Sequence, residues 1–276
     1  MTTERVVALL LDEDRRALVA AARQTRAIAR AARMVAGALG GRGRVVFIGA
    51  GTSGRLGVLE AAECPPTFGS DPRRIVGVMA GGERSVFRAV EGAEDRGDVG
   101  EREGRRLRPG DVLIGISASS VTPFVRGALA GARGKGARSV LVTCAPGRGL
   151  SRLAEVVVVV RSGPEVLTGS TRLKAGSATK AVLNAITTAA MIRLGKAYQN
   201  LMVDLRQTSK KLEDRARRIV AEAGGVEPAT AAALLELADG EAKTAIVMAR
   251  LGLRAEAARR RLKAAGGHVR KALRRR

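Results

Sequence analysis

Aromatic and acidic residues are scarce in this sequence. Phe, Trp and Tyr make up 2% of the 276 residues and Trp is absent, so the core must be built from Leu, Val, Ile and Ala. Asp and Glu number 26 against 49 Lys and Arg, which gives a formal net charge of +23. That charge suggests nucleic-acid binding, but no aromatic residues are interleaved to stack on bases. We favour Arg-filled solvated helix faces and expect no nucleic-acid partner.

Cysteine and histidine are also scarce. The two cysteines, Cys64 and Cys144, lie in different predicted segments and form no disulfide framework, which suggests a reducing compartment. His268 is the single histidine, and without a cluster of Cys and His there is no ligand set for zinc. The sequence therefore predicts no metal site.

No apolar run approaches the roughly 20 residues that are needed to cross a bilayer. The longest run, residues 156–160, is only long enough for a strand. The N-terminal segment MTTERVVALLLDEDRR lacks the charged, apolar and small-residue regions of a secretion signal. We expect a cytoplasmic protein that does not contact a membrane.

Short apolar runs alternate with helix-compatible segments through the first two thirds of the chain. Because these runs are continuously apolar, they predict a mostly parallel sheet covered on both faces, an α/β fold. The pattern before and after them is helical, and 173–194 is expected to be a long helix that is buried or at an interface. Between the second and third strands, 96–109 is expected as a charged loop. The expected strands are 45–48, 75–79, 112–117, 139–143 and 156–160, and the expected domains are 1–43 (helical), 44–207 (α/β) and 208–276 (small, helical).

A glycine-rich turn, 49–54, follows the first predicted strand and precedes a helix that is expected to end near Ala62, before Pro65 and Pro66. Its G-x-G-x-x-G spacing is that of dinucleotide-binding turns. No acidic residue ends the next strand to hold a ribose, and no P-loop lysine motif is present, so NAD and nucleoside triphosphates are disfavoured. Backbone amides at a helix N-terminus still bind anions. Gly51, with the hydroxyls of Thr52 and Ser53, therefore predicts a phosphate site.

The loop after the third predicted strand has similar chemistry. Ser117, Ser119, Ser120 and Thr122 supply four hydroxyls within six residues. A helix N-cap would explain one hydroxyl but not four. Because the carboxyl ends of parallel strands share one edge, where open α/β folds bind ligands, we expect both turns to form one pocket.

A third polar cluster leads into the long helix at 173–194. Ser170, Arg172 and Lys174 belong to it, and two interpretations remain open. The segment can cap the helix, or Arg172 or Lys174 can complete the anion site.

Two glutamates, Glu63 and Glu94, are placed at predicted element ends beside proline or glycine breaks. A solvated surface carboxylate is the usual role of such a residue. Paired carboxylates in different environments can instead act as acid and base. The spacing alone does not decide between the two.

Four segments carry a specific family resemblance: FIGAGTSGRLGVLEAAECPPTFG, AVEGAED, GPEVLTGSTRLKAGSATK and NLMVDLRQTSKKLEDRARRIV. They closely resemble the N-acetylmuramic acid 6-phosphate etherases, which belong to the sugar isomerase (SIS) superfamily of phosphosugar-binding domains. The resemblance covers nearly the whole chain. It implies a flavodoxin-like parallel sheet in the SIS domain at 44–207, a helical C-terminal part and a homodimer.

The resemblance also implies an activity, a carbon–oxygen lyase reaction without a metal or organic cofactor. The D-lactyl ether of N-acetylmuramic acid 6-phosphate is cleaved by elimination, and water then adds to give N-acetylglucosamine 6-phosphate and D-lactate. Matching the motif ECPPTFG implies that Glu63 is the proton donor. Matching EGAED implies that Glu94 is the second catalytic glutamate.

Two positions depart from the family pattern. The family usually opens with a longer segment containing T-E-x-R-N before the first helix, whereas here MTTERVVALL leads almost directly into DEDRRAL. The family's serine loop commonly reads A-S-G-R-T-P. Ser120 and Val121 stand here in place of Gly and Arg. These departures favour a rival interpretation, a non-catalytic phosphosugar sensor of the same fold.

Overall fold

The computed structural model describes residues 1–145, 149–205, 207 and 209–274. Two compact units make up the chain. One comprises 1–62 and 72–189, and the other comprises 63–71 and 190–276. The domain limits expected at 43/44 and 207/208 stay a prediction, because compactness does not establish that a segment folds alone.

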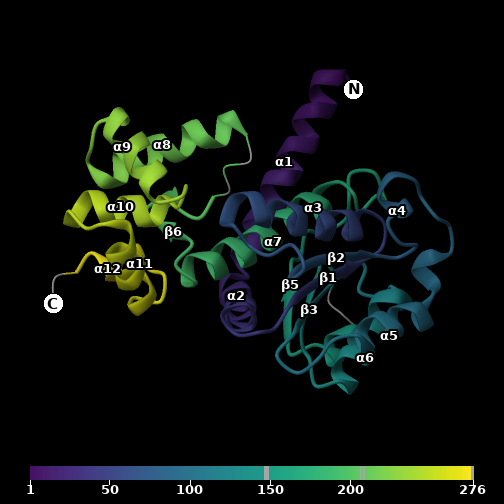
Figure 1. Ribbon diagram of the computed structural model, residues 1–276. Coiled ribbons are helices and arrows are strands. Elements are labelled where there is room, and N and C mark those ends of the chain that lie inside the picture. Colours follow the sequence, from purple (N-terminus) through teal and green to yellow (C-terminus); the bar gives the residue numbers. More distant parts are fainter. Residues whose placement is uncertain (146–148, 206, 208, 275–276) are drawn as a thin grey trace. The chain divides into compact units, whose positions relative to one another are not determined.

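The first unit is built on a five-stranded parallel sheet with the order β2-β1-β3-β4-β5 (Figure 1). This is the order of flavodoxin-like folds. The predicted α/β class, the flavodoxin-like sheet and all five predicted strands are therefore confirmed. The strands are β1 Val45–Gly49, β2 Ile75–Met79, β3 Val112–Ile116, β4 Arg138–Thr143 and β5 Val156–Val159.

Helices cover both faces of the sheet (Figure 1). Val46 and Ile48 point to a cluster formed with Phe124 and Leu129 of α6. Phe47, between them in β1, faces α3, since a Cβ placed on Gly57 of α3 would lie 2.9 Å from the Phe47 Cβ. The helical elements of this unit include α1 Thr3–Ala22, α2 Thr25–Gly40, α3 Gly51–Phe68 (which continues into the second unit), α4 Arg84–Phe87, η1 Ala93–Asp95, α5 Gly97–Arg105, α6 Pro123–Gly134, η2 Leu150–Leu153 and α7 Lys174–Arg193.

The segment expected as a charged loop at 96–109 is instead largely helical, as α5. The glycines of α5 explain why this segment is helical. Cβ atoms placed on Gly100 and Gly104 would collide with backbone carbonyl oxygens of α6, at Phe124 and Ala128. The two helices thus pack backbone against backbone, and the charged residues of α5 are left on its exposed side. The loop prediction for 96–105 was wrong because the contact that stabilises this helix is not local in sequence.

The two prolines predicted that helix α3 ends near Ala62, and this prediction was wrong. The helix continues through Pro65 and Pro66 to Phe68. Both prolines lie in the last turn. Each lacks the amide that would donate to the carbonyl four residues back, so the helix ends within one turn of them. The end is formed by Gly69, whose amide donates to the Pro65 carbonyl at 2.9 Å and whose φ is +60°.

The second unit is helical and has its own apolar cluster. Ile219, Ile246 and Val247 are among its buried residues. A two-stranded antiparallel hairpin, which the sequence did not predict, precedes the helices. The elements are β6 Ala197–Tyr198, β7 Leu201–Met202, α8 Lys210–Gly224, α9 Pro228–Leu237, α10 Ala242–Leu251, α11 Ala255–Ala264 and α12 Val269–Ala272.

Across the described residues, no helix has the length and apolarity that crossing a membrane requires. The cytoplasmic location stays a prediction.

Candidate functional site

In the glycine turn, a single residue, Ala50, separates β1 from α3. A Cβ on Gly49 would lie 2.8 Å from the Gly54 amide nitrogen, and one on Gly54 would lie 2.7 Å from the Gly49 carbonyl oxygen. Only glycine allows this approach. Gly51 opens the helix with φ of +53°, and Thr52 and Ser53 are half-buried in its first turn. Backbone amides in the first turn of a helix can bind an anion. Phosphate binding by Gly51, Thr52 and Ser53 stays a prediction.

The serine loop leaves the sheet beside this turn. In the parallel register, Gly49 of β1 stands opposite Ile116 of β3, so the loops that follow them emerge side by side. The Ser117 Oγ and Thr122 Oγ1 lie 2.9 Å apart and share a hydrogen bond. Thr122 is at the N-cap of α6, but its side chain makes no capping bond. Capping therefore does not explain these hydroxyls.

Ser119 and Ser120 differ in their environments within this loop. Ser119 is exposed, whereas Ser120 is only 2% exposed. The Ser120 backbone has φ of 62°, the left-handed region that favours glycine. Its Oγ has no hydrogen-bond partner among the described residues. The family's glycine at this place thus has a conformational reason, and the serine here carries both backbone strain and an unsatisfied hydroxyl.

The start of α7 lies close to the glycine turn. A Cβ on Gly176 would be 3.7 Å from the Thr52 Cγ2. The Glu165 carboxylate caps this helix by accepting from the amides of Lys174 at 3.2 Å and Ala175 at 3.0 Å. The interpretation of this segment as a helix cap is therefore supported.

The buried Lys174 ammonium forms an ion pair with Glu13 of α1. Its charge is already matched, so it can serve a ligand only by sharing or leaving Glu13. Ser170 is half-buried and Arg172 is exposed at this end of the helix. Substrate binding by these three residues stays a prediction.

The two glutamates occupy different local structures. Glu63 is exposed and lies within α3, not at its end as expected. It follows Gly51 by twelve residues, which corresponds to about 18 Å along the helix axis. Glu94 is exposed in the single turn of η1, just after Gly92, whose φ is +68°. Their catalytic roles stay predictions.

Arg55 makes a contact that no sequence motif indicated. Its Nε donates to the Val86 carbonyl at 2.7 Å and its Nη2 donates to the Ser85 carbonyl at 2.8 Å. The guanidinium thus ties the first turns of α3 to the segment that leads toward Glu94. The available signal was an arginine placed directly after a glycine turn.

No group of three or more His, Cys, Asp or Glu side chains in the described ranges could hold a metal ion. The expectation of a reaction without metal or organic cofactor stays a prediction.

In its fold, the five-stranded parallel sheet with its covering helices is similar to SIS sugar isomerase domains. Solved structures agree on the fold. A phosphoheptose isomerase from Neisseria gonorrhoeae matches with a TM-score of 0.53 at 20% identity, covering 68% of this chain and 97% of that one. One from Francisella tularensis matches with a TM-score of 0.54 at 16% identity, covering 70% and 100%. The model of the glucokinase regulatory protein N-terminal SIS domain matches residues 27–133.

Relatives of known name are much closer in sequence. The N-acetylmuramic acid 6-phosphate etherase of Mycolicibacterium smegmatis is 47% identical over 99% of this chain and 92% of its own length. That of Rubrobacter xylanophilus is 50% identical over 99% and 91%. The chain belongs to the N-acetylmuramic acid 6-phosphate etherase family, and the resemblance inferred from the motifs is confirmed.

Proposed function

We propose that this protein is a carbon–oxygen lyase that cleaves the D-lactyl ether of N-acetylmuramic acid 6-phosphate. The observation that carries the proposal is the family membership, at 47% identity over almost the full chain. The products are N-acetylglucosamine 6-phosphate and D-lactate, and the reaction belongs to the recycling of cell-wall sugars. The reaction uses no metal or organic cofactor.

The phosphate of the substrate binds where the two turns meet. The amides of the glycine turn from Gly51 onward, with Thr52 and Ser53, face the phosphate from one side. Ser117, Ser119, Ser120 and Thr122 supply hydroxyl groups from the neighbouring loop. The register that sets Gly49 opposite Ile116 supports this common pocket.

The chemistry requires a base and an acid. A carboxylate removes the proton from C2, alpha to the aldehyde of the open-chain sugar, and the C3–O bond to lactate breaks. Glu63 in its protonated form donates a proton to the departing lactyl oxygen, and Glu94 is the second catalytic carboxylate. Water then adds across the double bond between C2 and C3, with its hydroxyl at C3 and a proton at C2.

The working unit is a homodimer in which the site is shared. Glu63 lies about 18 Å along α3 from the turn that would hold the phosphate of the same chain, farther than a single sugar extends. We therefore assign Glu63 to a sugar bound at the partner's turn. Helix α1 supports an assembly, because Val7, Leu11 and Leu18 are exposed on it and its N-terminal part extends away from the sheet (Figure 1).

Release of D-lactate from N-acetylmuramic acid 6-phosphate tests the proposal directly. The wild-type protein should release lactate and form N-acetylglucosamine 6-phosphate in equal amounts. Glu63→Gln and Glu94→Gln should each lower kcat by at least about a hundredfold and leave substrate binding nearly unchanged. Wild-type activity in either variant would remove that glutamate from the mechanism.

A second candidate is a phosphosugar sensor without activity. It is favoured by Ser120 and Val121, which replace the family's Gly and Arg in the serine loop. Tight binding of N-acetylmuramic acid 6-phosphate without release of lactate would establish the sensor and reject the enzyme.

A further inference from the structure

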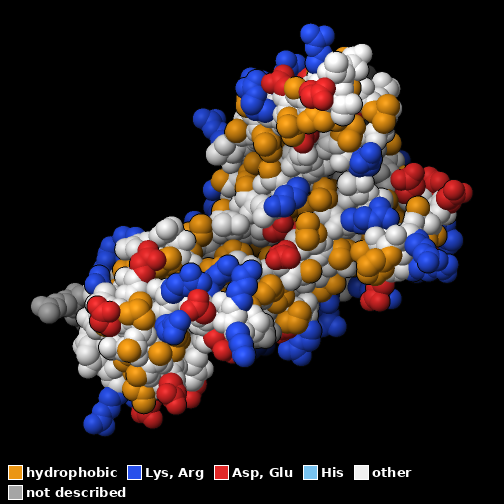
Figure 2. All heavy atoms as spheres, turned by 90° about the horizontal axis from the view of Figure 1, so that it is seen from above, with side chains coloured by type: hydrophobic (Ala, Val, Ile, Leu, Met, Phe, Trp, Pro, Cys, Tyr) orange, Lys and Arg blue, Asp and Glu red, His pale blue; other side chains and the backbone are white. Residues whose placement is uncertain are grey.

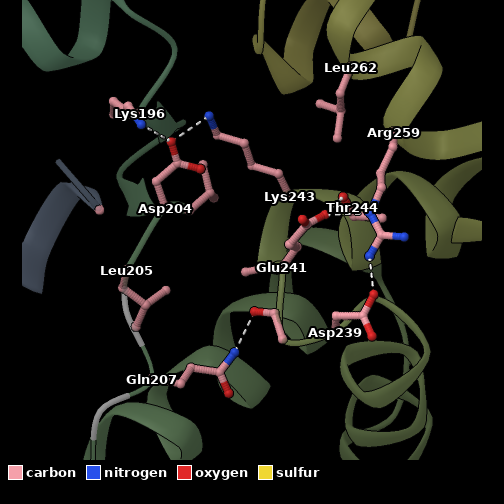
Figure 3. Close-up of a pocket in the computed structure, with 14 residues that line it drawn as sticks. Lys196, Asp204, Leu205, Gln207, Asp239, Glu241, Lys243, Thr244, Arg259 and Leu262 are labelled. Carbon is pink, nitrogen blue, oxygen red and sulfur yellow. Dashed lines mark hydrogen bonds and ion pairs between the residues drawn. The ribbon is translucent and has the colours of Figure 1, made fainter. Parts of the chain in front are cut away.

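The helical unit contains a polar cavity that the proposed reaction does not use. Its volume is about 580 Å³, within the range of sites for small molecules. One wall carries Asp204 with Lys196 and with Lys243 from the start of α10, and the other carries Asp239, Glu241 and Arg259 of α11 (Figure 3). All of the lining residues belong to this unit.

Two lysines share one carboxylate at the first wall. The Asp204 Oδ2 lies 2.7 Å from the Lys196 Nζ and 2.8 Å from the Lys243 Nζ. Their side chains are 29% and 13% exposed, so water solvates them only in part. Two ammonium groups against one carboxylate leave an excess of one positive charge.

The pKa of Lys243 lies below its usual value, mainly because the side chain is buried. Burial lowers the pKa of its ammonium, and the charge of Lys196 lowers it further, although Asp204 acts in the opposite direction. A second anion beside Lys243 would stabilise the charged form of its ammonium group. Residues 242–244 also line the cavity, and as the first three of α10 their amides have no acceptor within the helix.

The opposite wall carries an excess of one negative charge. Arg259 donates to Asp239 at 2.6 Å and to Glu241 at 2.8 Å, so one guanidinium faces two carboxylates. The cavity is thus positive at one end and negative at the other, and Figure 3 shows the two clusters on separate sides of it. A ligand that matches both ends has an oxyanion and, away from it, donors of hydrogen bonds.

We propose that this cavity is a second ligand site, which binds a small phosphorylated sugar with its phosphate between Lys196 and Lys243. The sugar hydroxyls donate to the free carboxylate oxygens of Asp239 and Glu241. The site lies in the helical unit, apart from the glycine turn and the serine loop. It does not depend on the etherase activity.

Hydrogen exchange read by mass spectrometry can locate this binding on the full chain. With N-acetylglucosamine 6-phosphate as the probe, peptides covering 239–248 should exchange more slowly, in addition to any protection at 49–55. Protection confined to 49–55 and 117–122 would overturn the proposal. So would equal protection by chloride at the same ionic strength, because an unspecific ionic effect would then suffice.

Substitutions at the lysines give the affinity test. Lys243→Met should weaken the binding seen at 239–248 at least about tenfold, the value of one charged hydrogen bond. Lys263→Met, at an exposed lysine of the same unit, is the matched control and should leave it unchanged. Binding that survives Lys243→Met undiminished would contradict the proposal.

A substitution that is expected to strengthen binding excludes misfolding as the cause of a weaker one. Asp204→Asn releases both lysines from their shared carboxylate and should strengthen binding several-fold, which a merely destabilised unit would not do. Weaker binding in Asp204→Asn would count against the site. Inorganic phosphate should bind more weakly than the sugar phosphate, and equal affinity would reject the sugar at the carboxylate end.

Discussion

Ser120 combines two unfavourable features at one position, a left-handed backbone and a buried hydroxyl without a partner among the described residues. Either one costs on the order of 1 kcal/mol. Proteins retain such costs mainly at functional sites. The position of Ser120, beside the proposed phosphate pocket, agrees with that pattern.

Replacing Ser120 by glycine should therefore stabilise the protein by about 1 kcal/mol, after allowing for the greater freedom of glycine in the unfolded chain. Urea unfolding measures the change. If the hydroxyl binds substrate, the same variant should have a higher KM. Ser119→Gly, in the same loop but exposed and without positive φ, is the control and should not stabilise. A loss of stability in Ser120→Gly would mean that the hydroxyl makes a favourable contact.

Helices α5 and α6 owe their contact to small residues. Gly100 and Gly104 of α5 meet backbone carbonyls of α6, and Gly127 and Gly131 of α6 meet the backbone of α5 in return. This arrangement leaves no room for a β-carbon at the contact. A glycine inside a helix normally destabilises that helix. These four glycines therefore stabilise the fold only by allowing the two helices to pack closely.

Gly104→Ala should cost about 2–3 kcal/mol, because its methyl group would overlap the Ala128 carbonyl oxygen and force the helices apart. Gly37→Ala is the matched control, since Gly37 lies inside α2 with no atom within 4 Å of its missing Cβ. The control should gain about 0.5–1 kcal/mol from helix propensity. Equal effects of the two substitutions in thermal or urea unfolding would argue against close packing of α5 on α6.

A shared site in a homodimer has a consequence for mixed assemblies. Glu63→Gln removes the proposed acid, and Ser53→Asp places a negative charge where the phosphate should bind. In a hybrid dimer one site carries both defects and the other carries neither. Mixing the two inactive variants under conditions of subunit exchange should restore about a quarter of the wild-type activity. Activity that stays absent in verified hybrids would place both residues in the same chain's site.

The net charge of +23 is distributed rather than concentrated. On the face shown in Figure 2, Lys and Arg side chains are interspersed with acidic and apolar ones. Several arginines pair with acids of their own helix, as Arg15 and Arg16 do with Asp12. Such pairs are typical of solvated helix faces and contribute little to stability.

Binding to duplex DNA should accordingly be weak and unspecific. We expect binding to be detectable only at low salt and to vanish near physiological ionic strength. The reason is that binding releases counterions from the DNA, and this release contributes less free energy as the salt concentration rises. A fluorescence polarisation titration at several salt concentrations measures this. Binding that persists at physiological salt would support a nucleic-acid partner.

Much of this architecture was determined by local sequence. The β-branched runs set the five strands, because a continuously apolar segment of strand length is stable only inside a covered sheet. The glycine spacing of 49–54 set the turn, since only residues without a Cβ permit that approach. The long motifs determined the family, which the full-length relatives confirmed.

The tertiary structure decided the features that depend on distant segments. Helix α5 forms because α6 offers a surface for its glycines, and α3 ends at Gly69 and not at its prolines. The charge of Lys174 is committed to Glu13, far away in the sequence. Two lysines likewise converge on Asp204 only when the helical unit is folded. A sequence specifies which groups are present, whereas their pairing follows from packing between segments that no local pattern relates.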